Sequence, residues 1–114
     1  MKADSILLVF DQPNRPDLAP IAKDIINKIN PYHFDEKNLA LYYYLRTYTK
    51  YRCYDTLTEA DDSVINYAIS YFENGGSNRD ITRSYIMKGA IQEELGNSTK
   101  PLAHYWYTRA IDVV

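Results

Sequence analysis

Few side chains in this 114-residue sequence have the spacing that a catalytic or metal-binding site requires. His33 and His104 are its two histidines, and neither has a second histidine three or four positions further on, where both rings would share one helix face. Glu93 and Glu94 are adjacent, and consecutive side chains point about 100° apart around a helix, so they are not placed to share a proton as a carboxylate dyad does. We therefore expect no enzymatic activity, no metal and no cofactor.

The single cysteine, Cys53, excludes a disulfide within one chain. The neighbouring Arg52 would lower the pKa of a reactive thiol, whereas partial burial would make Cys53 an inert structural side chain. We favour the structural interpretation.

The charge balance argues against nucleic acid and membrane as partners. The chain has 13 Lys and Arg against 15 Asp and Glu, a formal net charge of −2. Binding to phosphates, or stacking of single-stranded RNA bases on aromatic side chains, needs a basic surface that this composition does not provide. The apolar run at residues 6–10 is far shorter than the ~20 residues of a membrane helix, so we expect no membrane contact by this segment.

Tyrosine is the unusual feature of the composition, with 12 residues beside three Phe and one Trp. The large ring can pack while its phenol tip stays hydrated, so tyrosines suit both cores and binding surfaces. Tyr44, Tyr48 and Tyr51 follow one another at intervals of four and three, and therefore form one row along a helix. Two interpretations stay open for this row: packing against the preceding helix, or lining a groove for a partner.

Apolar periodicity predicts helices throughout, and no sustained period-two alternation predicts a strand. After a short N-terminal helical segment, Asp17 is the expected N-cap of a helix over residues 17–30, which Pro31 ends. One face of this helix is an apolar stripe of Leu18, Ile21, Ala22, Ile25, Ile26 and Ile29. The stripe predicts burial against a neighbouring helix.

Capping signals place the later helices. Thr58 and Asp61 have capping-box spacing, and Asn74-Gly75-Gly76 is the expected left-handed C-cap of the helix that they begin. Ser77 begins a further helix, which Gly96 stops. The predicted fold is all-α and forms one domain, with about five main helices near residues 17–30, 36–54, 58–74, 79–95 and 99–114.

The last two predicted helices resemble a tetratricopeptide repeat. Tyr85 and Gly89 match the first aromatic and the glycine of that pattern, and Ala103, Tyr107 and Ala110 match its second helix at spacings of four and three. Small residues allow two helices to approach closely, with the two tyrosines filling the space around them.

The resemblance implies an α–α superhelix of antiparallel hairpins. It divides the single domain of residues 1–114 into a partial repeat helix at 17–30, a first hairpin at 36–74 and a second hairpin at 79–114. The second hairpin ends on an apolar helix without a stop signal, so we expect the chain to be a fragment of a longer protein.

A further likeness, over residues 61–72 and 89–97, is to the N-terminal repeats of bacterial multi-repeat lipoproteins and sensor-regulator proteins. It implies a scaffold within a bacterial sensor or regulatory protein. The cell-envelope or periplasmic side is then the expected location, with the cytoplasm as the alternative.

In this family the first helix of each hairpin lines a concave groove. The resemblance places Arg83, Ile86, Ala90 and Glu93 on the groove in the second hairpin, and a 42-residue offset adds Leu41, Tyr44, Tyr48 and Tyr51 from the first. We therefore expect a non-catalytic scaffold that presents this groove to a peptide or protein partner, with tyrosine rings as anchors.

A rival interpretation is self-association. A repeat array needs a polar capping helix, and the C-terminal helix is apolar instead. Trp106, Ile111 and Val114 would then form the face of a homodimer.

Overall fold

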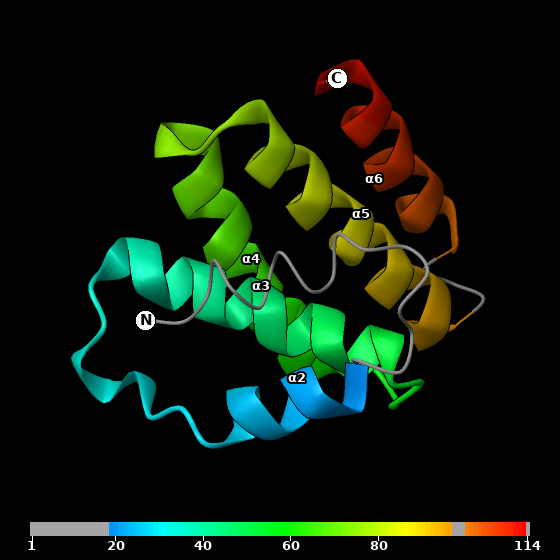
Figure 1. Ribbon diagram of the computed structural model, residues 1–114. Coiled ribbons are helices and arrows are strands. Elements are labelled where there is room, and N and C mark those ends of the chain that lie inside the picture. The colour runs from blue at the N-terminus through cyan, green and yellow to red at the C-terminus, as the bar shows by residue number, and fades with distance from the viewer. Residues whose placement is uncertain (1–18, 97–99, 114) are drawn as a thin grey trace.

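The computed structural model describes residues 19–96 and 100–113, and this part of the chain is helical without a strand (Figure 1). The prediction of an all-α fold with five main helices is confirmed. The expected N-terminal helical segment, the Asp17 cap and Val114 lie outside the described residues. The elements are α2 (Ala19–Asn27), the short 3-10 helix η2 (Pro31–His33), α3 (Glu36–Arg52), α4 (Glu59–Gly75), α5 (Asn78–Leu95) and α6 (Lys100–Val113).

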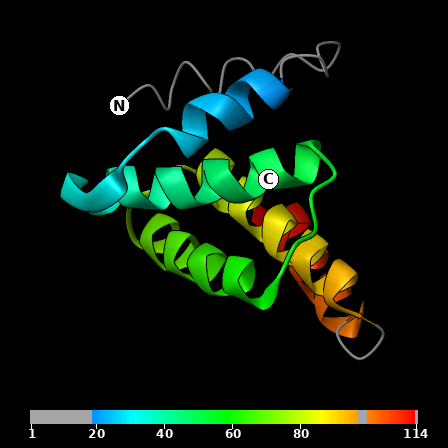
Figure 2. The same cartoon turned by 90° about the horizontal axis from the view of Figure 1, so that it is seen from below.

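Each helix packs on the next along the chain, and α5 with α6 is the most extensive pair. Figure 2 shows α2, α3 and α4 stacked in that order, with α5 and α6 beyond them. A smaller contact joins α3 directly to α5. The hairpins α3–α4 and α5–α6 therefore share one continuous core, while the superhelical arrangement stays a prediction.

The capping box expected at Thr58 is present, and a second one begins α5 at the predicted start, Ser77. The hydroxyl of Thr58 accepts the amide of Asp61 while the Asp61 carboxylate accepts the Thr58 amide, and Ser77 with Asp80 does the same at the start of α5. Each pair satisfies backbone donors that the first helical turn would leave unbonded. Asp35, which the sequence reasoning did not single out, caps α3 by accepting the amide of Asn38 at 2.9 Å.

The prediction of a left-handed C-cap at Asn74-Gly75-Gly76 is wrong. Helix α4 continues through Gly75, and Gly76 has an extended backbone with φ −90°. A Cβ at Gly76 would lie 2.9 Å from the Cα of Phe72, so glycine is needed there for close approach to the preceding turn. The left-handed region is used instead at Gly96, where the predicted stop of α5 is confirmed, and at Tyr54.

The apolar stripe of the first predicted helix is buried only in part. Ala19, Ala22 and Ile26 are buried, whereas Ile21 and Ile25 are 55% and 37% exposed. Helix α2 packs chiefly on α3, and one neighbour covers a narrower face than the sequence stripe occupies.

Helices α5 and α6 approach each other closely at Gly89. A Cβ at Gly89 would lie 2.5 Å from the ring of Tyr107, so only glycine admits this ring at its present distance. Ala103 and Ala110 are also buried on α6, as the pattern predicts. The expectation of a close helix crossing is confirmed here.

Buried charges join α4 to the helices on either side. Lys50 Nζ lies 2.6 Å from Asp61 Oδ2, and Lys88 Nζ lies 2.6 Å from Asp62 Oδ1. Burial alone would raise the pKa of Asp61, but the bonds from Lys50 and Thr58 hold that pKa below its usual range. Asp61 is therefore an ionised structural group.

Candidate interaction surface

The predicted row of tyrosines forms a stacked column along α3. The rings of Tyr44 and Tyr48 lie 5.7 Å apart at an interplanar angle of 8°, and those of Tyr48 and Tyr51 lie 6.4 Å apart at 22°. Tyr44 is buried, Tyr48 is half-buried and Tyr51 is 49% exposed. The column thus passes from the core to the surface within two helical turns.

Because exposure increases along the row, the core interpretation applies to one end of it and the groove interpretation to the other. The ring of Tyr44 belongs to the core, so the prediction that it lines an open groove is wrong. Leu41 is likewise buried. Tyr48 is partly buried against the core cluster, and Tyr51 is the most exposed member of the row.

The α5 residues assigned to the groove differ among themselves in the same way. Ala90 is buried, Arg83 is half-buried, and Ile86 and Glu93 are exposed. The phenol of Tyr107 donates a 2.9 Å hydrogen bond to Glu93. Burial first, and then this bond, raises the pKa of Tyr107, so the phenol stays protonated.

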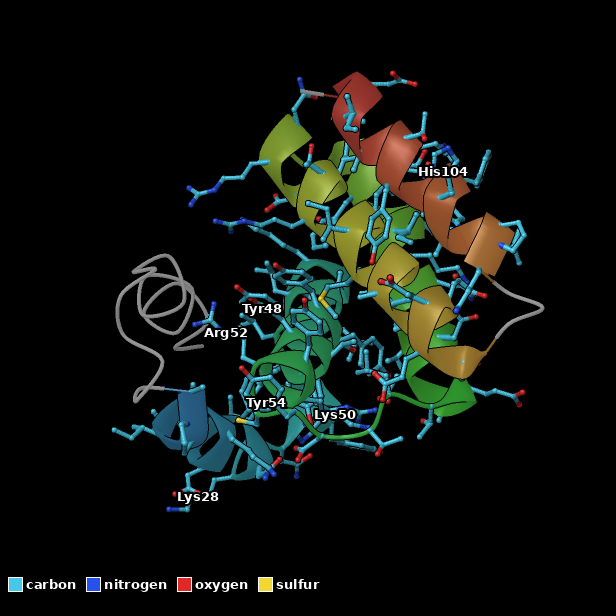
Figure 3. All side chains as sticks on the ribbon, turned by 90° about the vertical axis from the view of Figure 1, so that its right-hand side faces the viewer. Lys28, Tyr48, Lys50, Arg52, Tyr54 and His104 are labelled. Atoms are coloured by element: carbon cyan, nitrogen blue, oxygen red, sulfur yellow. The ribbon has the colours of Figure 1, made fainter. Side chains whose placement is uncertain are left out.

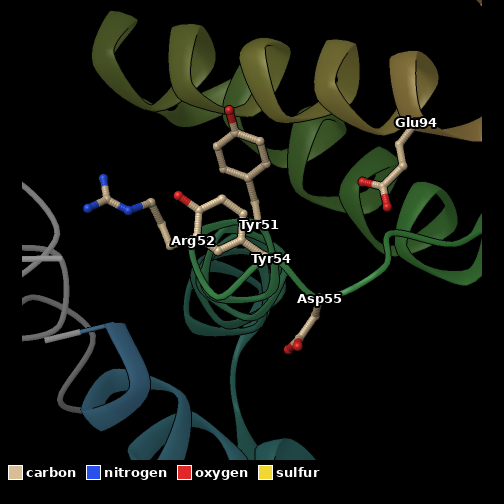
Figure 4. Close-up of a pocket in the computed structure, with 5 residues that line it drawn as sticks. All are labelled: Tyr51, Arg52, Tyr54, Asp55 and Glu94. Atoms are coloured by element: carbon tan, nitrogen blue, oxygen red, sulfur yellow. The ribbon is translucent and has the colours of Figure 1, made fainter. Parts of the chain in front are cut away.

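A hollow of about 490 Å³ lies beside the last turn of α3 (Figure 4). We call it the α3 pocket, and its lining residues are Tyr51, Arg52, Tyr54, Asp55 and Glu94. Of the residues that the sequence analysis assigned to a partner-binding groove, Tyr51 alone lines this pocket. Figure 3 places Tyr48, Arg52 and Tyr54 together at this end of α3, with His104 on α6 far from them.

Tyr54 has an unusual backbone for a tyrosine. Its φ of 59° is left-handed, a conformation that residues other than glycine adopt at a steric cost. The amide of Asp55 donates to the carbonyl of Lys50 at 2.9 Å, the bond that closes a Schellman turn at the end of a helix. The Tyr54 residue is 97% exposed, so the hydrogen bonds of this turn, and not packing of the ring, offset the cost.

Hydrogen bonds from two other helices fix the wall of the pocket after Tyr54. Asp55 Oδ2 lies 2.7 Å from Lys23 Nζ of α2, and this bond raises the pKa of Lys23. Glu94 Oε1 of α5 accepts the amide of Leu57 at 3.0 Å. The connection between α3 and α4 is therefore tied to α2 on one side and to α5 on the other.

Arg52 points away from the two carboxylates of the pocket. Figure 4 shows its guanidinium and Glu94 on opposite sides of the Tyr51 and Tyr54 rings. The Cζ of Arg52 lies 6.0 Å from the ring centroid of Tyr48, at the outer limit of a cation–π contact. Arg52 makes no ion pair with a described residue.

The self-association residues are only partly exposed. Trp106 is half-buried, with its ring 5.4 Å from that of Tyr85. Ile111 is 73% exposed, and Val114 lies outside the described residues. Of the predicted face, Ile111 is thus the member that the structure presents to a partner.

The remaining candidates for chemistry are ordinary side chains. Cys53 is half-buried, and burial raises the pKa of its thiol, which supports the structural interpretation. His33 and His104 are exposed. Over residues 19–96 and 100–113, no group of three or more His, Cys, Asp or Glu is arranged to hold a metal, and no helix is long and apolar enough to cross a membrane.

Comparison with known proteins gives no match: no family model, no curated protein and no solved structure is similar to this chain.

Proposed function

We propose that this chain is a non-catalytic helical scaffold that binds a peptide or protein partner, and that the α3 pocket is part of its binding surface. The observation that carries this proposal is Tyr54, a strained residue with a fully presented ring. The tetratricopeptide-like contact of Gly89 with Tyr107 fits the same role, with a bacterial sensor or regulatory protein as its proposed setting.

The strain at Tyr54 is the first argument. A left-handed backbone costs a residue with a Cβ about 1–2 kcal/mol, which glycine would avoid. A ring that is 97% exposed gains almost nothing from burial within the chain. The left-handed backbone serves the Schellman turn that ends α3, but that turn does not require a tyrosine. An exposed aromatic ring at a position that suits glycine points to contacts with another molecule.

The second argument is composition and rigidity. Tyrosine and arginine are the residues that most often anchor protein interfaces, and the pocket presents two tyrosines and one arginine. The bonds to Lys23 and Glu94 hold its wall in place before any partner arrives. A preformed site loses less conformational entropy when it binds.

The proposal is tested by selecting a displayed peptide library on the whole chain and measuring the affinity of each selected peptide. The variant Tyr54→Gly removes the ring at a position where glycine suits the backbone, and we expect it to weaken binding by about tenfold, the usual effect of losing one anchor. Tyr32→Ala is the matched control, because Tyr32 is 81% exposed on η2 outside the pocket. Selected peptides that bind both variants as they bind the original chain would overturn the proposal.

Self-association is the second candidate, and the 73% exposure of Ile111 favours it. Light scattering at low micromolar concentration tests it against Ile111→Asp. A dimer that the substitution dissociates supports this candidate, and a monomer in both cases excludes it.

A further inference from the structure

We infer that the α3 pocket receives a cationic side chain, lysine or arginine, from an extended segment of the partner. This inference rests on the proposed function and specifies what the pocket recognises. Its basis is the juxtaposition of two exposed tyrosine rings with two carboxylates that each have an unused oxygen.

The rings supply the first part of the site. Tyr51 is 49% exposed and Tyr54 is 97% exposed, and both line the same hollow. The face of an aromatic ring carries negative potential, so it attracts a lysine or arginine head group. No described cation lies over either ring, in contrast to Tyr48, which has Arg52 above it.

The carboxylates supply the second part. Glu94 uses Oε1 for the amide of Leu57, and Asp55 uses Oδ2 for Lys23. The other oxygen of each group has no hydrogen-bond partner among the described residues. Two fixed carboxylates with one free acceptor each complement a group that has only donors.

The charge distribution on the carboxylate side of the pocket disfavours an anion. Asp55 is paired with Lys23, whereas Glu94 makes no ion pair with a described residue and keeps its negative charge uncompensated. The guanidinium of Arg52 lies on the other side of the rings from Glu94, so it does not neutralise that carboxylate (Figure 4). The Glu94 side of the pocket therefore favours a cation.

The chain contains an occupied example of this arrangement. The Cζ of Arg109 lies 4.6, 4.9 and 5.6 Å from the ring centroids of Tyr85, Trp106 and Tyr105, and its Nη2 lies 3.1 Å from Glu73 Oε2. We call these five residues the Arg109 cluster. Rings and a carboxylate surround a cation there as the α3 pocket would surround one from a partner.

Titration of the isotopically labelled whole chain with four blocked pentapeptides, followed by NMR, tests the inference. The peptides are Gly-Ala-Xaa-Ala-Gly, in which Xaa is lysine, arginine, glutamate or norleucine, the neutral analogue of lysine. We expect the lysine and arginine peptides to shift the amides of Tyr54, Asp55 and Leu57 at millimolar concentration, and the other two peptides to shift none. Glu94→Gln should weaken binding of the lysine peptide by about threefold or more. Tyr54→Gly should abolish the chemical-shift changes, and the control Tyr32→Ala should leave them unchanged.

Three results would overturn the inference: equal shifts with norleucine, stronger binding of the glutamate peptide, or no shift with any peptide up to about 5 mM. The library experiment separates this failure from failure of the proposed function. Selected peptides that depend on Tyr54 but carry no basic residue would leave the scaffold function in place and refute the cationic specificity alone. Selected peptides that do not depend on Tyr54 would refute the binding surface itself.

Discussion

The Arg109 cluster and the α3 pocket combine the same kinds of side chain, and one is closed while the other is open. In the Arg109 cluster the cation comes from the chain, and its bonds to Glu73 and Tyr85 tie α6 to α4 and α5. In the α3 pocket the rings face solvent and each carboxylate keeps one free oxygen. Identical chemistry thus stabilises the fold where it is satisfied internally, and is available for recognition where it is not.

The largest expected difference between the two regions is in stability. Arg109→Ala removes three ring contacts, an ion pair and hydrogen bonds to two phenols, and leaves the half-exposed Glu73 bonded to Tyr85 but without its cation, so we expect the free energy of unfolding to fall by about 2 kcal/mol. Arg52→Ala should change it by less than about 0.5 kcal/mol, because among the described residues Arg52 has only a distant ring contact and one long hydrogen bond. Urea denaturation of both variants measures the difference. Equal losses would show that the two regions are not distinct.

High pH should weaken the closed region through ionisation of Tyr85. Burial, and then the hydrogen bond to Glu73, raises the pKa of Tyr85 to about 12, whereas an unfolded tyrosine titrates near about 10. The folded state thus disfavours the phenolate, so this contribution to stability is complete below pH 10 and is lost as the pH rises toward 12. Melting temperatures between pH 9 and 12 should fall less steeply for Tyr85→Phe, which has no phenol to ionise. A slope as steep as that of the original chain would contradict the role given to Tyr85.

The smallest expected effect is a gain in stability at the open region. Tyr54→Gly relieves a left-handed backbone and removes a ring that packs on nothing, so the free energy of unfolding should rise by up to about 1 kcal/mol. The greater freedom of glycine in the unfolded chain reduces this gain. Thermal unfolding at neutral pH measures it, and Tyr32→Ala again serves as the control. A loss of more than about 1 kcal/mol would mean that the Tyr54 ring stabilises the fold.

Local sequence signals predicted the helices well, and they identified where α4 and α5 begin but not how α4 ends. Thr58 with Asp61 and Ser77 with Asp80 act within one turn, so spacing alone identifies them. The close contact of Gly89 with Tyr107 could be predicted because the sequence pattern that this region resembles contains both positions.

The α3 pocket could not be predicted from local sequence signals. Nothing in the residues around Tyr54 signals a left-handed turn, since no glycine is present there. Glu94 reaches the pocket from 37 positions beyond Leu57, a separation that local patterns do not describe. The burial of each tyrosine in the row could not be predicted either. Burial of Tyr44 and exposure of Tyr51 depend on which neighbouring helix lies over each turn of α3.

The bond between Lys23 and Asp55 gives the first described helix an influence on the pocket. When α2 separates from α3, Asp55 loses its internal counter-ion and the pocket becomes more negative. A cationic ligand would then bind more strongly to the detached form and, by thermodynamic reciprocity, would promote the detachment. If the pocket binds a cation, we therefore expect faster hydrogen exchange in α2 when the ligand is bound.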